Sequence, residues 1–72
     1  MRYKDEVFMK NLEALIKRSG KTKSKVAEDL GISRQALSLW LNGRSFPTGE
    51  GLDKIAKYFK ISKVMLFVGD FN

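Results

Sequence analysis

Cysteine and histidine are both missing from the 72 residues of this sequence. Their absence excludes disulfides, thiolate nucleophiles and zinc-finger ligand sets, and it removes the most common general base. Only serine with lysine could supply a nucleophile, and each serine considered below is explained by helix capping or by a place on the surface. We therefore expect no enzymatic activity, no metal ion, no cofactor and no small-molecule ligand.

Long hydrophobic runs are missing as well. The longest, Val64–Val68, is far too short to cross a bilayer, and no apolar segment follows Met1. We therefore expect no membrane partner and a cytoplasmic location. A hydrophobic content of 43% nevertheless argues against intrinsic disorder, so the chain should fold.

Acidic residues are the minority among the charged ones. Fourteen Lys and Arg stand against eight Asp and Glu, which gives a net charge of +6 and favours a polyanionic partner. A chain this short buries only about 60% of the surface that it exposes when unfolded, so its core must be simple. We expect one domain over residues 1–72.

Helical periodicity divides the chain into five segments, and no strand pattern competes with it. The predicted helices cover residues 6–18, 23–30, 33–41, 49–59 and 63–68. Each has a side chain that can cap its N-terminus at its first position or just before it, namely Asp5, Thr22, Ser33, Thr48 and Ser62. The predicted fold class is a compact all-α domain.

The second and third predicted helices are short and meet at Gly31. Two helices that cross steeply need a small residue at their contact, a turn residue that tolerates positive φ, and apolar residues that pin the second helix. Ala27, Gly31, Leu37 and Trp40 supply these features. The pattern predicts a helix-turn-helix over about residues 23–42.

The stretch VAEDLGISRQALSLWLNG, residues 26–43, resembles the lambda-repressor-like family of helix-turn-helix regulators, the phage repressor and Cro type. The resemblance covers nearly the whole chain. It implies five helices, with the second and third as the unit that binds double-stranded DNA, in a bacterial or phage-encoded protein that associates with the nucleoid when bound. Lys23 stands where the family often has Gln.

The face of the third predicted helix opposite its apolar residues is free to enter a major groove. It comprises Arg34, Gln35, Ser38 and Leu39, our candidates for contacting bases. Gln35 matches the N6 and N7 edge of adenine, whereas Arg34 suits either guanine or a phosphate. Ser38 suits either base edges or the backbone. Leu39 is either a partner for a thymine methyl group or an incidental surface residue.

A second group of residues is predicted to contact phosphates. It consists of Lys21, Lys23, Lys25, Ser33, Asn42, Arg44 and Thr48. Basic residues crowd positions 17–25 with no acid among them, although a helix N-terminus favours acids, which suggests phosphate binding. The alternative is a solvated basic surface. For Ser33, capping alone is the alternative.

The C-terminal segment has more apolar residues than its predicted helix can bury. The resemblance implies that Leu66 and Phe67 enter the core, which leaves a group predicted to form a dimer or partner surface: Val64, Met65, Val68 and Phe71. One interpretation is a homodimer, weak in solution and stronger on an inverted-repeat operator, with reading helices about 34–36 Å apart. The other is contact with a further C-terminal domain.

These features favour a sequence-specific transcription regulator, a repressor or activator of phage or mobile-element type that acts by occupying an operator. The alternative is an antitoxin or another protein-interaction module. In that case the C-terminal apolar segment binds a toxin, and DNA binding is autoregulatory. The operator sequence and the sign of regulation do not follow from the sequence.

Overall fold

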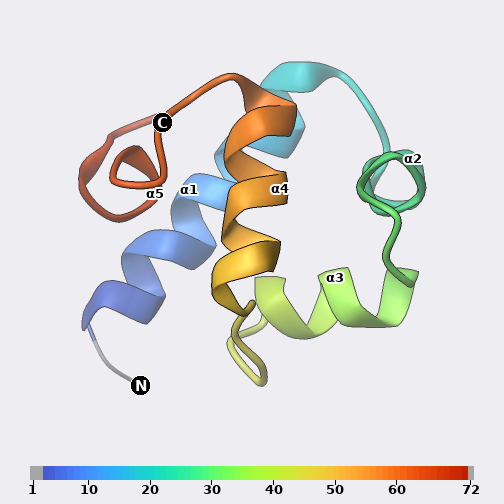
Figure 1. The fold of residues 1–72 in the computed structure, drawn as a ribbon, viewed down its shortest axis with the longest axis horizontal. Coiled ribbons are helices and arrows are strands. Elements are labelled where there is room, and N and C mark those ends of the chain that lie inside the picture. Colours follow the sequence, from blue (N-terminus) through green and yellow to red (C-terminus); the bar gives the residue numbers. More distant parts are fainter. Residues whose placement is uncertain (1–2, 72) are drawn as a thin grey trace.

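Five helices make up the structure, a computed structural model that describes residues 3–71 (Figure 1). They are α1 (Tyr3–Ser19), α2 (Lys23–Leu30), α3 (Arg34–Leu41), α4 (Gly49–Phe59) and α5 (Met65–Val68). The predicted all-α fold with five helices is confirmed. Within residues 3–71, no helix combines the length and the apolar composition needed to cross a membrane.

A single core joins all five helices. α1 contacts α3 and α5, and α2 contacts α3 and α4. The largest fully buried side chains are Phe8, Leu12, Val26, Leu37, Ile55 and Leu66. Every helix contributes at least one of them, and burial of each such side chain contributes about 1.5–3 kcal/mol. Because α2, α3 and α5 are too short to be stable alone, their helical structure depends on this shared burial.

The start of α1 differs from the prediction. The helix begins at Tyr3, so Asp5 lies within its first turn and is not its N-cap. An acidic residue is favourable at the positive end of the helix dipole both as a cap and inside the first turn. The residue type therefore did not distinguish the two positions.

The start of α5 also differs from the prediction. The helix begins at Met65, and Ser62 does not cap it: Val64 holds the N-cap position and makes no side-chain capping bond. The N–H groups of Met65 and Leu66 donate to the carbonyls of Ser62 and Lys63, at 3.1 Å each. These backbone bonds form a tight turn and satisfy groups that a capping hydroxyl would otherwise serve.

Asn11 is a buried polar residue in α1 that the sequence pattern did not single out. Its side chain is 2% exposed. The Nδ2 group donates to the carbonyl of Leu66 at 2.9 Å and to that of Met65 at 3.4 Å. Both acceptors belong to α5, so these bonds attach the short last helix to the middle of α1.

Replacing Asn11 by Ala should lower the free energy of unfolding by about 1–3 kcal/mol, because a buried carbonyl of α5 loses its donor. Urea denaturation followed by circular dichroism measures this change. Lys10→Ala, at an exposed position of the same helix, is the control and should stay within about 0.5 kcal/mol of wild type. Equal effects of the two substitutions would show that the bonds to α5 contribute little.

Candidate nucleic-acid interface

The turn between α2 and α3 depends on Gly31. Its φ is 75°, in the left-handed region, and its N–H donates to the carbonyls of Ala27 and Glu28. The N–H of Ile32 then donates to the carbonyl of Ala27 at 3.0 Å. These bonds end α2 and redirect the chain within a few residues. Figure 1 shows α2 almost end-on and α3 from the side, so the two helices cross steeply.

α3 has one buried side and one polar side. Leu37 is 1% exposed and fixes the helix to the core. On the other side Arg34, Gln35 and Ser38 are exposed, as the helical wheel predicted. Leu39 is only partly exposed. Three of the four candidate base-contacting residues therefore form an open polar face, and Leu39 lies at its margin.

The loop after α3 folds back on the helix. Gly43 has a φ of 77°, and the N–H groups of Arg44 and Ser45 donate to the carbonyl of Leu39 at 3.0 and 3.3 Å. Asn42 Oδ1 also accepts the N–H of Arg44, at 3.0 Å. The backbone N–H of Arg44 is thus used within the protein. The Arg44 guanidinium and the Asn42 amide are the groups that an incoming phosphate could meet.

Two candidate phosphate-contacting residues cap helices. Ser33 Oγ accepts the N–H of Ala36 at 3.0 Å, and Thr48 Oγ1 accepts the N–H of Gly51 at 3.3 Å. Both residues are exposed. A hydroxyl that accepts one bond keeps its hydrogen for donation. Capping is therefore compatible with a contact to phosphate at both positions.

The lysines around the start of α2 lie near acidic side chains, although the segment of residues 17–25 contains no acid itself. Lys25 Nζ lies 3.3 Å from Asp29 Oδ1 and 4.0 Å from Glu28 Oε1, and Lys21 Nζ lies 3.5 Å from Asp29 Oδ2. Lys23 makes no ion pair within the described part of the chain. Of the three predicted phosphate contacts in this segment, two are therefore paired within the protein.

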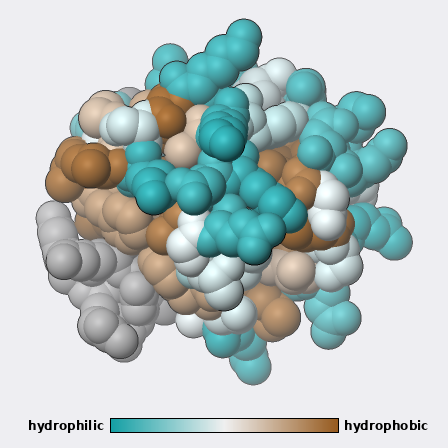
Figure 2. Space-filling view, viewed as in Figure 1, coloured by the Kyte–Doolittle hydropathy of each residue, from teal (hydrophilic) through white to brown (hydrophobic). Residues whose placement is uncertain are grey.

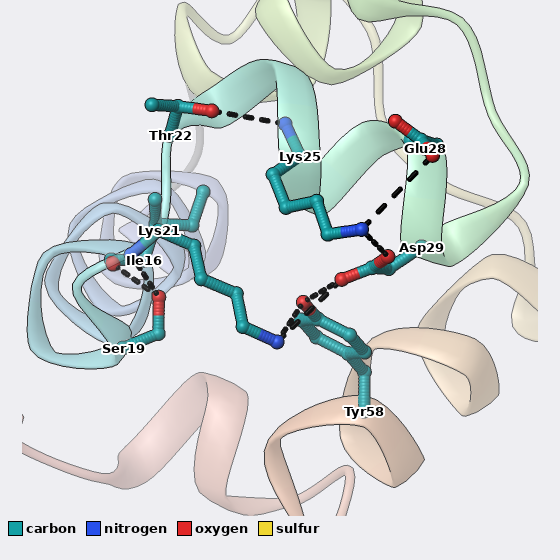
Figure 3. Close-up of polar contacts among 8 residues, drawn as sticks. All are labelled: Ile16, Ser19, Lys21, Thr22, Lys25, Glu28, Asp29 and Tyr58. Atoms are coloured by element: carbon teal, nitrogen blue, oxygen red, sulfur yellow. Dashed lines mark hydrogen bonds and ion pairs between the residues drawn. The ribbon is translucent and has the colours of Figure 1, made fainter.

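Tyr58 of α4 completes this cluster, which we call the Tyr58 network: Lys21, Lys25, Asp29 and Tyr58 (Figure 3). Lys21 Nζ donates to the phenol oxygen at 2.9 Å, and the phenol O–H donates to Asp29 Oδ2 at 2.6 Å. The Lys21 ammonium also lies 4.9 Å from the centre of the Tyr58 ring, in a cation–π contact. The network links the α1–α2 loop, α2 and α4.

Neither Asp29 nor Tyr58 was predicted from the sequence as part of the site. The spacing of four between Lys25 and Asp29 was a usable signal, because residues four apart lie on one side of a helix. No local pattern could pair Tyr58 with Lys21, since 37 positions separate them.

Comparison with known proteins agrees with this geometry. A sequence model of the helix-turn-helix family matches residues 12–66, a range that includes α2, the turn, α3 and α4. This chain belongs to the lambda-repressor-like family of helix-turn-helix DNA-binding regulators. The resemblance inferred from residues 26–43 is thereby confirmed.

Two proteins similar to this helix-turn-helix domain are transcription regulators by name. It is similar to the HTH-type transcriptional activator BcrR of Enterococcus faecalis, with 37% identity over 65 residues, which is 88% of this chain and 31% of that protein. The chain thus spans about a third of the activator. It is also similar to the solution structure of the SOS-response transcriptional repressor LexA from Eubacterium rectale. There the TM-score is 0.86 and the identity 30%, over 92% of this chain and 70% of that one.

In the helix-turn-helix domain, the Tyr58 network favours the charged forms of Asp29 and Lys21. The hydrogen bond from Tyr58 is the main factor that lowers the pKa of the Asp29 carboxyl, and the Lys25 ammonium adds to it. The bond to Tyr58 likewise raises the pKa of the Lys21 ammonium, with a further contribution from the Asp29 charge. Partial desolvation opposes both shifts.

The domain exposes apolar side chains on and beside α5. Val64 is 64%, Met65 40% and Val68 70% exposed. Figure 2 shows apolar atoms at the left of the molecule, where α5 lies in Figure 1, and mostly hydrophilic side chains on the right, around α2. Phe46, which the sequence pattern did not single out, is 42% exposed, and its ring centre lies 6.0 Å from that of Phe67.

Phe71 does not share this exposure, although the sequence analysis grouped it with these residues. Its side chain is partly buried against the core, and its ring lies 5.9 Å below the Arg18 guanidinium of α1. Gly69 allows this arrangement, because a Cβ there would lie 2.9 Å from the Phe71 ring and 2.5 Å from the Met65 carbonyl. The chain can therefore fold back over α1 after α5.

Replacing Tyr58 by Phe should raise the pKa of Asp29 toward its ordinary 3.8 and lower that of Lys21 toward 10.5. NMR titration of the Asp29 carboxyl carbon measures the first change. The Asp29 contribution to stability is present above pH 3.8 and is lost as pH falls through its lowered pKa. The Lys21 contribution is present below pH 10.5 and is lost as pH rises through its raised pKa.

The Phe variant should therefore lose part of the stability that wild type has between these limits. An Asp29 titration identical in the two proteins would show that the phenol and the carboxylate are not bonded in solution.

Proposed function

We propose that this helix-turn-helix domain binds a specific sequence of double-stranded DNA, with α3 in the major groove. The observation that carries the proposal is the open polar face of Arg34, Gln35 and Ser38 on a helix that Leu37 fixes to the core. The major groove admits an α-helix and displays a distinct pattern of donors and acceptors for each base pair. The protein regulates transcription by occupying its operator, without chemistry.

Gln35 is the principal base-contacting residue in this proposal. Its amide donates to N7 of adenine and accepts from N6, a pairing worth about 1–3 kcal/mol of discrimination when both bonds form. Arg34 binds the guanine edge or a phosphate, and Ser38 contacts a base edge or the backbone. Leu39, at the margin of the polar face, packs against a thymine methyl group with the part of its side chain that is exposed.

Phosphate contacts on both sides of α3 set its position in the groove. Lys23, at the first position of α2, makes one of them. Arg44, Asn42 and the hydroxyls of Ser33 and Thr48 make the others. Lys21 and Lys25 also lie at this end of α2, but they contact phosphate only when they are released from Asp29.

The regulator works as a dimer of the phage or mobile-element repressor and Cro type, weak in solution and stronger on DNA. The stretch of residues 26–43 that resembles phage repressors supports the type. The exposed Val64, Met65 and Val68 support the dimer, because apolar surface of this kind favours a partner. Two copies related by a twofold axis would place their α3 helices about 34–36 Å apart on an inverted repeat. Such a regulator acts in the cytoplasm, on the nucleoid.

Selection from a randomised duplex library at about 0.15 M salt, followed by sequencing, tests this function, because non-specific phosphate binding is weak at that salt concentration. We expect an enriched inverted repeat. Val68→Asp should shorten the enriched sequence to a half-site, since it places a charge on the proposed dimer surface. Absence of any enrichment in wild type would contradict the proposal and would favour a protein-interaction module that uses α5.

Substitutions at Gln35 and Lys23 should weaken binding in different ways. Gln35→Ala should lose discrimination at one base position, by about 1–3 kcal/mol. Lys23→Ala should weaken binding to every sequence alike and reduce the slope of log affinity against log salt by about 0.9. Competition binding with single-position operator variants separates the two patterns. Uniform losses from both substitutions would remove Gln35 from the base-contacting set.

A further inference from the structure

The charges around the start of α2 are arranged in an unusual way for a surface that attracts DNA. Three lysines gather there, yet two are paired with Asp29. Asp29 is more enclosed than the neighbouring acid: its side chain is 22% exposed, against 77% for Glu28. An acidic group beside phosphate contacts opposes DNA binding, so its presence calls for a physical explanation.

Asp29 engages both lysines at once. Oδ1 lies 3.3 Å from Lys25 Nζ, while Oδ2 lies 3.5 Å from Lys21 Nζ and accepts the Tyr58 hydroxyl at 2.6 Å. Glu28 is a contrasting case, since it makes one contact of 4.0 Å with Lys25. Tyr58 orients the Asp29 carboxylate and also binds Lys21 directly, through its oxygen and its ring. Lys21 is thus held by three contacts from two helices (Figure 3).

We propose that Asp29, oriented by Tyr58, limits the sequence-independent affinity of this surface for DNA by holding Lys21 and Lys25 away from phosphates. The inference rests on the proposed function. Non-specific binding to DNA arises from phosphate contacts, and each one adds about 0.9 to the salt slope. With Asp29 in place, Lys23 is the lysine at this end of α2 that is ready to contact phosphate, and the base-contacting face of α3 supplies the remaining affinity at the correct sequence.

The test measures binding of the full chain to a duplex of scrambled sequence between about 50 and 200 mM salt, by fluorescence anisotropy. Asp29→Asn should bind more tightly than wild type at the lowest salt and should steepen the salt slope by about 0.9–1.8, as one or two lysines are released. Glu28→Gln removes the same charge from the same helix and should change the slope by much less. The difference between the salt slopes of these two variants separates the effect of the Asp29 ion pairs from the effect of net charge.

Tyr58→Phe supplies a second variant, which leaves the net charge of the protein unchanged. It should steepen the slope by up to about 0.9, because Lys21 loses its bond to the phenol while Lys25 stays paired. Circular dichroism shows whether each variant is folded. If Asp29→Asn does not fold, the salt slope of Tyr58→Phe tests the inference in its place.

Equal slopes for Asp29→Asn and Glu28→Gln would overturn the inference. So would weaker binding by Asp29→Asn with an unchanged or shallower slope, since that result would mean that Asp29 orients the lysines toward DNA. Both results would leave the proposed function intact, because they require wild type to bind the duplex. If neither wild type nor any variant binds the scrambled duplex at the lowest salt, this inference fails, whereas the proposed function is decided separately by selection from the randomised library.

Discussion

Burial of Leu37 against the other helices is the interaction on which the candidate site depends. α3 has eight residues, and a helix of that length is unstable by itself in water. It persists because Leu37 joins Phe8 of α1, Ile55 of α4 and Leu66 of α5 in one core. The direction of the polar face follows from this anchoring, since the side chains opposite Leu37 must point to solvent. Residues spread over most of the chain therefore position the few that are proposed to contact DNA.

The fold also determines which basic side chains remain available at the surface. The net charge of +6 attracts DNA from a distance, but the fold decides which cations remain available at the surface. At the start of α2, Asp29 and Tyr58 engage two of the three lysines. A count of basic residues in this segment therefore overestimates the number of lysines without an acidic partner. The same bonds attach α2 to α4, so they contribute to the position of the helix-turn-helix as well as to its charge.

α5 shows how a short segment can be attached firmly and still present an apolar surface. Leu66 enters the core, and Asn11 donates to two carbonyls of the helix. Because α5 has four residues, it cannot bury more than one side, and Val64 and Val68 remain exposed. The ring contact between Phe46 and Phe67 places the loop that follows α3 next to this surface. A partner bound to α5 would therefore lie close to a loop that is proposed to contact phosphate.

The sequence by itself determined the five helices, the turn at Gly31 and the polar face of α3, because periodicity, capping and left-handed glycine are properties of neighbouring residues. Tertiary structure decided what depends on distant segments. It placed Phe71 against α1, attached α5 through Asn11, and brought Tyr58 to Asp29 across 29 positions. Local sequence patterns indicate which side of a helix a residue occupies. Only the packing of the chain decides which groups from other helices contact that residue.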